Sequence, residues 1–360
     1  MSTTRPSSRD DFEIAIVCAL PLEYNAVSLA FDEFWDHDGG HYGKADGDPN
    51  TYLTGRIGKF NVAMALLPRS GKVNAAGAAV SLRFSYKNIQ LALLVGICGA
   101  VPRAGNDEIL LGDVVIAKSI IEFDYGEYPD KFTRKRTEQD LTKPNKDISN
   151  LLMSFETCHG SQLLHEKTAH FLKELQRKAG PSFGSDYTYL GWREDILFGP
   201  TYRHKHRGTP ACICKDCHGR LDPVCDEALV ASCHDLQCDE RYQVSRERLE
   251  LKQQSDDDEI QNPKIFLGPV ASGDTVLKSG EDRDRIAKDE GVIAFEMEGA
   301  GIWEDVPTIL VKGACDYADC HKSKKWQKYA AITAASAAKA ILERCIRRDK
   351  TTGKVLDRGE

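Results

Sequence analysis

The chain has 360 residues, a formal net charge of −7, and 41% apolar and 29% charged residues. These values are typical of a globular protein with a sizeable core. The acidic balance argues against a general nucleic-acid binder, and no stretch approaches the apolar length that a membrane-spanning helix needs. The opening residues 1–11, MSTTRPSSRDD, lack the apolar centre of a signal peptide. We therefore expect a cytoplasmic protein with a short disordered leader that binds neither nucleic acid nor a membrane.

Apolar runs alternate with helix-like segments over most of the chain, which favours a single α/β domain. The predicted elements before residue 123 are a strand over 12–20, a helix over 22–31, a hairpin over 51–67 that turns near Gly58, a small-residue helix over 70–86, and strands over 89–101 and 111–121. Strand patterns resume over 263–277, 291–304 and 306–316, and an alanine-rich helix is expected over 324–347. The polar stretch 123–261 between them is rich in His and Cys. We interpret it as an insertion in one domain over 12–347, which a charged tail over 348–360 follows.

Four of the predicted strands end in unusual residues. These endings are ALPLE at 19–23, GICGAV at 96–101, FEMEGAG at 295–301 and CDYAD at 315–319. An acid after a strand is more often a helix cap or a solvated loop charge than a catalyst. Adjacent carboxylates beside Phe295 and Met297 are harder to explain in that way, because a charge near a core needs a partner.

Taken together and in this order, the motifs resemble those of the nucleoside phosphorylase and nucleosidase superfamily. That superfamily includes purine and uridine phosphorylases, methylthioadenosine nucleosidase and AMP nucleosidase. The resemblance extends over 12–347 and is greatest to phosphorylase-like domains of fungi, which share the CALPLE, ASGD, EMEGAG and KGxCDYAD runs. It implies a three-layer α/β/α fold with a central mixed, partly barrel-like sheet and a long cysteine-rich insertion. We also expect a homo-oligomer, either a dimer or a trimer.

The resemblance implies roles for three acids in breaking a glycosidic C–N bond through a ribosyl cation-like transition state. Asp316 would protonate N7 of the purine as general acid. The resemblance also implies that an Asp at this position recognises adenine. Glu298 would bind the ribose hydroxyls through charge-assisted hydrogen bonds. Glu23 would orient and deprotonate the attacking water. The further substrate-binding candidates are Ile97, Cys98, Gly99, Val276, Leu277, Phe295, Glu296 and Met297, although Val276 and Leu277 could equally be core residues.

The nucleophile is the main open question at this stage. Ile97 replaces the hydroxyl residue with which phosphorylases of the superfamily hold phosphate, and no Arg lies near Pro21. An apolar side chain cannot replace a lost phosphate donor, so we favour water. Arg69 could still contact an anion, so a phosphate-dependent purine nucleoside phosphorylase is an alternative. A catalytically silent nucleotide sensor and a zinc-ribbon interaction protein are further alternatives.

Cations near these motifs suggest contacts to a 5′-phosphate. The candidates are Arg69, Lys278, His321 and Lys322. On this basis we expect AMP or ATP to be preferred to adenosine, and adenosine to methylthioadenosine. Such cations are, however, usually solvated surface charges.

Half of the twelve cysteines lie between Cys212 and Cys238. Cys214 and Cys217 form a Cys-x-x-Cys pair near His204, a spacing that suits tetrahedral zinc. The predicted ligands are His204, Cys212, Cys214 and Cys217, with His206 and Cys225 as alternatives for the fourth. The zinc would be structural and catalysis would need no cofactor; free thiols in a loose loop are the alternative.

Overall fold

The computed structural model describes residues 5–36, 42–127, 133–134, 144–180, 187–207, 211–254, 259–303 and 305–346. In this part of the chain a sheet of nine strands runs in the order β12-β11-β8-β13-β5-β1-β4-β3-β2. Its strands are β1 (Ile14–Cys18), β2 (Glu33–Phe34), β3 (Tyr52–Ile57), β4 (Phe60–Leu66), β5 (Leu91–Ala100), β8 (Val114–Glu122), β11 (Ile265–Ser272), β12 (Ala294–Glu296) and β13 (Thr308–Asp316). Two short ladders join β6 (Arg103–Ala104) to β7 (Asp107–Glu108) and β9 (Gly126–Glu127) to β10 (Thr133–Arg134).

One half of this sheet closes into a ring. The short strand β12 pairs in parallel with β11 and antiparallel with β5, so that β12, β11, β8, β13 and β5 form a closed circuit. Because β13 runs parallel to β5 but antiparallel to β8, the sheet is mixed. The predicted mixed, partly barrel-like sheet is therefore confirmed.

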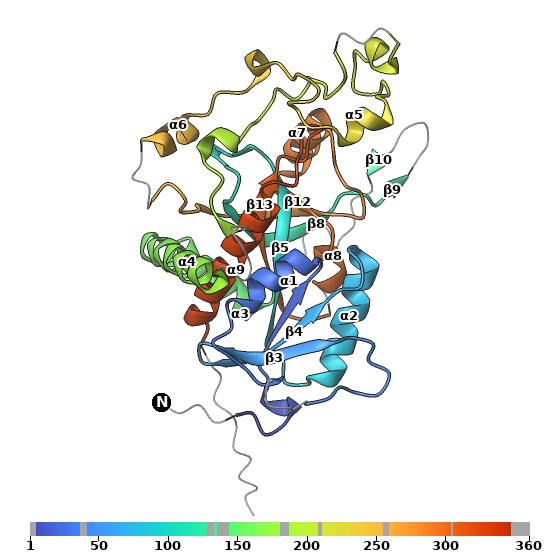
Figure 1. The fold of residues 1–360 in the computed structure, drawn as a ribbon. Helices are drawn as coiled ribbons and strands as arrows, with labels where there is room; N and C mark the ends of the chain where they lie inside the picture. Colours follow the sequence, from blue (N-terminus) through green and yellow to red (C-terminus); the bar gives the residue numbers. More distant parts are fainter. Residues whose placement is uncertain are drawn as a thin grey trace, which may run out of the picture.

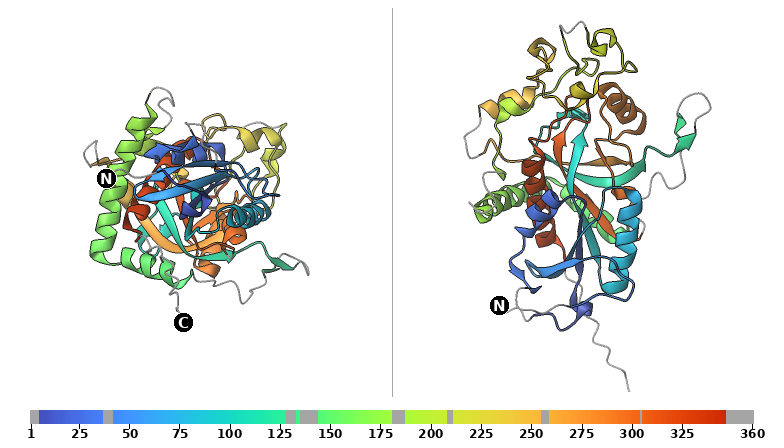
Figure 2. Two further views of the ribbon diagram at one scale, coloured as in Figure 1. Left: turned by 90° about the horizontal axis from the view of Figure 1, so that it is seen from below. Right: turned by 45° about the vertical axis from the view of Figure 1, so that its right-hand side comes forward.

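Helices cover both faces of the sheet. Those described are α1 (Pro21–Ser28), α2 (Lys72–Ser85), α3 (Lys146–Phe155), α4 (Cys158–Ala179), α5 (Asp226–Val230), α6 (Glu247–Gln253), α7 (Gly280–Glu290), α8 (Gly299–Ile302) and α9 (Gln327–Arg344). Helix α9 packs on β13 and β5 and is flanked by α1 and α4, whereas α2 packs against α8. In the right-hand view of Figure 2, α2 (cyan) lies on the opposite side of the sheet from α9 (red) and α4 (green).

Small residues explain how closely α9 approaches the sheet. Most of its alanines are fully buried, and a Cβ on Gly313 of β13 would lie 2.0 Å from the carbonyl oxygen of Ala330. Any larger residue at Gly313 would push the helix away from the strand. The alanine-rich pattern thus reflects a helix that is buried on nearly all sides.

Two parts of the predicted domain organisation lie within the described residues. Residues 5–11 of the predicted leader belong to the described fold: Arg9–Asp11 forms a short 3-10 helix capped by Ser8, and Tyr42 donates a hydrogen bond to the carbonyl of Pro6. Residues 1–4 and the predicted tail 348–360 lie outside the described residues. Helices α3 and α4, whose residues fall in the predicted insertion 123–261, pack together, and α4 packs on α9. Figure 1 shows the remaining stretch, with α5 and α6, at one end of the sheet beside α7.

None of the helices in the described part of the chain combines the length and the apolarity needed to cross a membrane.

Candidate active site

A cavity of about 660 Å³, including its open mouth, lies where β1, β5, β12 and β13 end. Eleven of the predicted catalytic and substrate-binding residues line it, namely Glu23, Ile97, Cys98, Gly99, Val276, Leu277, Phe295, Glu296, Met297, Glu298 and Asp316. The lining also includes Ser70, Thr275, Cys315 and Gln327, which were not among the predicted site residues.

Glu23 is held rigidly at the start of α1. Its carboxylate accepts hydrogen bonds from the backbone N–H groups of Ala19 (2.8 Å), Leu20 (2.9 Å) and Ile97 (2.9 Å). Pro21 occupies the first turn, where its missing N–H costs nothing, and the carboxylate complements the positive end of the helix. A Cβ on Gly96 would lie 2.3 Å from Oε1 of Glu23, so glycine at this position makes room for the acid.

Burial raises the pKa of Glu23, while the positive charge of Lys312 acts in the opposite direction. The side chain is 2% exposed and lines the cavity. A carboxylate whose pKa is shifted toward neutrality is a better proton acceptor than an ordinary surface glutamate. The position and environment of Glu23 therefore suit a general base.

Asp316 ends β13 opposite Gly99 of β5, next to an irregularity in the strand pairing. Such irregularities re-aim side chains near functional sites. Oδ1 accepts a hydrogen bond from the N–H of Ala318 (2.8 Å), and Oδ2 lies 3.1 Å from Nζ of Lys322. A Cβ on Gly99 would lie 3.0 Å from Oδ1, so the glycine turn leaves space for this carboxylate. Asp316 is only 5% exposed and faces the cavity.

Glu296 and Glu298 share one buried ammonium group. Nζ of Lys312 lies 3.2 Å from Oε2 of Glu298 and 3.4 Å from Oε2 of Glu296, and Lys312 is 1% exposed. Burial alone would lower the pKa of Lys312, but Glu298, Glu296 and Glu23 together raise it. One ammonium cannot neutralise three carboxylates, and burial, opposed by Lys312, still raises the pKa of Glu296.

The two glutamates differ in what they leave available. Glu296 accepts hydrogen bonds from the N–H groups of Glu298 and Gly299, so its carboxylate builds the turn that follows β12. Glu298 accepts one hydrogen bond from the N–H of Gly71 through Oε1, at 3.3 Å, besides its contact with Lys312. Glu298 therefore retains acceptor capacity toward the cavity, where a hydroxyl-bearing ligand could bind.

Lys312 is the residue that sequence reasoning missed. It stands within the buried strand TILVKGACD, every residue of which is buried. A single Lys inside an apolar run is a usable signal, because a charge in a core requires partners of opposite sign.

The candidate phosphate contacts are not gathered at the cavity. Among Arg69, Lys278, His321 and Lys322, only Lys322 lines it. Arg69 and Lys278 are exposed. His321 directs its ring nitrogens to the insertion: Nε2 lies 2.8 Å from the carbonyl oxygen of Tyr202 and Nδ1 lies 3.5 Å from Sγ of Cys233. His321 is therefore not part of the described lining, and its position gives no support to its predicted role as a phosphate contact.

The predicted zinc ligands are also divided by the fold. His204 lies with Cys233, Cys238 and His321, whereas Cys212 and Cys214 lie with His206 and Cys225. Cys217 joins neither group: Nε of Arg203 donates to its Sγ at 3.4 Å. A single site made of His204, Cys212, Cys214 and Cys217 is therefore wrong. Cys225, which was predicted only as an alternative ligand, lies beside Cys212 and Cys214 in place of Cys217.

Comparisons with known proteins agree with this architecture. A family profile described as the phosphorylase superfamily matches residues 13–179. A nucleotide-binding leucine-rich repeat (NLR)-like protein of Hyaloscypha variabilis is 30% identical over 345 residues, which are 94% of this chain and 30% of that protein. A 5′-methylthioadenosine/S-adenosylhomocysteine nucleosidase of Mycobacterium bovis is 27% identical over 85 residues, or 22% of this chain and 33% of that enzyme. The chain thus spans about a third or less of the length of these relatives.

Among solved structures, the 5′-methylthioadenosine/S-adenosylhomocysteine nucleosidase of Helicobacter pylori, complexed with a pyrrolopyrimidine-substituted pyrrolidinol, is similar with a TM-score of 0.52 and 14% identity. The match covers 93% of this chain and 99% of the bacterial one. At this identity the likeness establishes the fold. The family profile confirms the predicted resemblance to the phosphorylase superfamily over residues 13–179, and the solved structure confirms the predicted fold.

Proposed function

We propose that the chain hydrolyses the N-glycosidic bond of a purine nucleoside and releases adenine from adenosine or its 5′-phosphates. The observation that carries the proposal is the convergence of Glu23, Glu298 and Asp316 on one cavity at the ends of separate strands. The relatives that are named nucleosidases provide the class of reaction. They do not determine the base or the substituent at the 5′ end.

The reaction follows from the chemistry of the three acids. Asp316 donates a proton to the leaving base, which leaves poorly as an anion. Glu298 accepts hydrogen bonds from the ribose hydroxyls and places negative charge near the cationic sugar of the transition state. Glu23 takes a proton from the water that attacks the anomeric carbon, and its three backbone hydrogen bonds keep it in one orientation.

The lining of the cavity favours water over phosphate as nucleophile. Ile97 places an apolar side chain beside Glu23, and Arg69 does not line the cavity. One observation supports phosphorolysis as a second candidate: Ser70 lines the cavity and could offer a hydroxyl to phosphate. Two carboxylates near a bound phosphate would repel it, however, and only Lys322 offers a cation from the described lining.

The preference for AMP or ATP remains part of the proposal but depends on Lys322. This side chain is 25% exposed and pairs with Asp316. A 5′-phosphate that reached Lys322 would compete with that pair. Lys322→Gln should therefore reduce kcat/KM for AMP more than for adenosine.

Product analysis tests the proposal directly. Adenosine, AMP and ATP would each be incubated with the protein in phosphate-free buffer and in buffer with added phosphate, and the products separated by chromatography. Hydrolysis predicts free adenine with ribose or ribose 5-phosphates in both buffers. Ribose 1-phosphate that forms only with added phosphate would establish phosphorolysis instead, and ligand binding without turnover would establish a sensor.

A further inference from the structure

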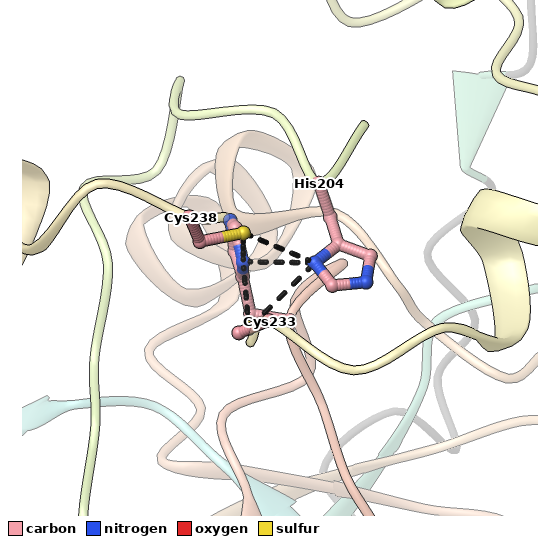
Figure 3. Close-up of side chains that lie close together, drawn as sticks. His204, Cys233 and Cys238 are labelled. Atoms are coloured by element: carbon pink, nitrogen blue, oxygen red, sulfur yellow. Dashed lines mark hydrogen bonds between the residues drawn. The ribbon is translucent and has the colours of Figure 1, made fainter. Parts of the chain in front are cut away.

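Four side chains from distant parts of the chain converge beside the loop that follows β13. They are His204, Cys233 and Cys238 of the insertion and His321, which comes five residues after Asp316. Their potential ligand atoms all lie within 4.8 Å of one another. Figure 3 shows His204, Cys233 and Cys238 directing their nitrogen and sulfur atoms toward a common centre.

The spacing of these atoms is that of a tetrahedral zinc site. Zinc bonds of about 2.0–2.1 Å to nitrogen and about 2.3 Å to sulfur, at tetrahedral angles, separate two nitrogens by about 3.3 Å and a nitrogen from a sulfur by about 3.6 Å. The two Nδ1 atoms of His204 and His321 are 3.3 Å apart. The four nitrogen–sulfur distances are 3.7 and 3.5 Å for Cys233 and 3.6 and 3.9 Å for Cys238.

The hydrogen bonds of the two imidazoles match this arrangement. Nε2 of His204 lies 3.0 Å from the carbonyl oxygen of Ala231, and Nε2 of His321 lies 2.8 Å from that of Tyr202. A carbonyl oxygen can only accept, so each Nε2 carries a hydrogen, and in the neutral imidazole Nδ1 is then the nitrogen with the lone pair that can bind a metal. Metal-bound histidines are held in the same way by a backbone carbonyl on the second nitrogen.

A second group of ligands lies wholly within the insertion. It comprises His206, Cys212, Cys214 and Cys225. Nδ1 of His206 lies 3.2 Å from Sγ of Cys225 and 3.7 Å from Sγ of Cys212, and the sulfurs of Cys214 and Cys225 are 3.7 Å apart. The N–H groups of Cys214 and Cys225 donate to neighbouring cysteine sulfurs, as they would to thiolates.

We propose that the chain binds two zinc ions. The loop zinc is held by His204, Cys233, Cys238 and His321, and the insertion zinc by His206, Cys212, Cys214 and Cys225. Two thiolates and two imidazoles favour zinc at the first site, and three thiolates and one imidazole do so at the second. All twelve cysteines are free thiols in the structure, so no disulfide competes for these sulfurs.

The loop zinc connects the insertion to the candidate active site. Residues 317–326 form the segment between β13 and α9. Its start is held by Arg283, whose guanidinium donates to the carbonyl of Tyr317 at 2.9 Å and lies 3.7 Å from Asp319. In its middle, His321 is followed by Lys322, the partner of Asp316. A zinc on His321 therefore fixes the part of the loop that positions Lys322 against the acid.

Metal content tests the two sites without any assumption about activity. The wild-type protein, purified under reducing conditions without chelator, should contain about two zinc ions by elemental analysis. Cys233→Ser and Cys225→Ser should each contain about one, and Cys217→Ser, a matched control at a buried cysteine outside both groups, should keep two. Zinc loss in Cys217→Ser, or full zinc content in Cys233→Ser, would overturn the assignment, as would a Cys233–Cys238 disulfide in the wild type.

The same variants test whether the loop zinc fixes the loop beside the candidate active site. Only the kinetic part of this test rests on the proposed hydrolysis. Hydrogen–deuterium exchange over 316–325 should accelerate in Cys233→Ser and remain at the wild-type rate in Cys225→Ser. The value of kcat/KM should fall about tenfold or more in Cys233→Ser and less than about threefold in Cys225→Ser, as is typical when a supporting ligand is lost. Equal effects of the two variants on exchange would refute the connection. A wild type that binds two zinc ions but hydrolyses no nucleoside would refute only the proposed function.

Discussion

Replacing Lys312 with methionine would test whether one buried ammonium group holds the acids of the cavity. Methionine retains the approximate length and packing of the lysine side chain but removes the ammonium group that pairs with Glu296 and Glu298. Removing one member of a buried ion pair costs about 3–5 kcal/mol, because the other charge remains buried without a partner. Since Lys312 is 1% exposed, solvent does not reduce this cost, and we expect the free energy of unfolding to fall by about that amount at neutral pH.

The loss should depend on pH with a definite sign. Burial raises the pKa of Glu23 and Glu296 above that of an exposed glutamate, and Lys312 acts against this rise. Both carboxyl groups therefore bind protons more tightly in the folded than in the unfolded protein, and the free energy of unfolding falls as pH rises above the unfolded value. Without Lys312 the folded pKa values rise further. The destabilisation should then increase between pH 5 and pH 8, by at most about 1.4 kcal/mol per pH unit for each group that stays protonated.

Urea unfolding at pH 5 and pH 8, followed by tryptophan fluorescence, would measure both effects. Lys339→Met is a matched control, since Lys339 is also buried and pairs with two acids, Asp32 at 2.8 Å and Glu174 at 3.3 Å. Both variants should be less stable, but only Lys312→Met should lose kcat/KM, by about tenfold to a hundredfold for a lost hydrogen bond of about 1.5–3 kcal/mol to Glu298. The reasoning would be refuted if Lys312→Met had the wild-type free energy of unfolding at both pH values, or if the two variants lost activity equally.

Three further predictions concern the acids themselves. In the wild type, kcat/KM should rise with pH through a pKa above that of ordinary glutamate as Glu23 ionises, and this limb of the pH profile should disappear in Glu23→Gln. Gly96→Ala places a methyl group 2.3 Å from Oε1 of Glu23 and so displaces this carboxylate; kcat should fall about tenfold or more while circular dichroism shows a native fold. Asp316→Asn keeps the shape but removes the proton, and kcat should fall on the order of 10²-fold while KM changes little; wild-type kinetics would exclude Asp316 as the acid.

Much of the fold could be predicted because its signals are local. The hairpin that turns at Gly58 appears as β3 and β4, and the buried runs appear as β1, β5, β8, β11 and β13. Closure of the ring could not be derived from patterning. It depends on β12, a strand of three residues that pairs with β5 across almost two hundred residues of sequence. Only the resemblance to a family indicated a barrel-like sheet.

The proposed metal ligands show where spacing misleads. Cys214 and Cys217 have the spacing of a zinc pair, yet Cys217 turns toward Arg203 and Asp222. His204 instead meets His321, which lies 117 residues further along the chain. No local pattern contains such a contact, because it depends on how the insertion folds back on the loop after β13. The same contact could not be anticipated when His321 was predicted to bind phosphate.

One segment, from Lys312 to Lys322, connects the features that were predicted separately. Side chains alternate along β13, but this strand is buried on both faces, so a charged side chain on either face must find a partner inside the protein. Lys312 pairs with Glu296 and Glu298. Asp316, at the end of the strand, lines the cavity and pairs with Lys322. Between Asp316 and α9, Asp319 lies 3.7 Å from Arg283, and His321 contacts Tyr202 and Cys233 of the insertion. The insertion therefore contacts the chain only a few residues after the candidate acid. If the proposed loop zinc binds there, we expect the insertion to influence the chemistry of the cavity, although none of its described residues lines that cavity.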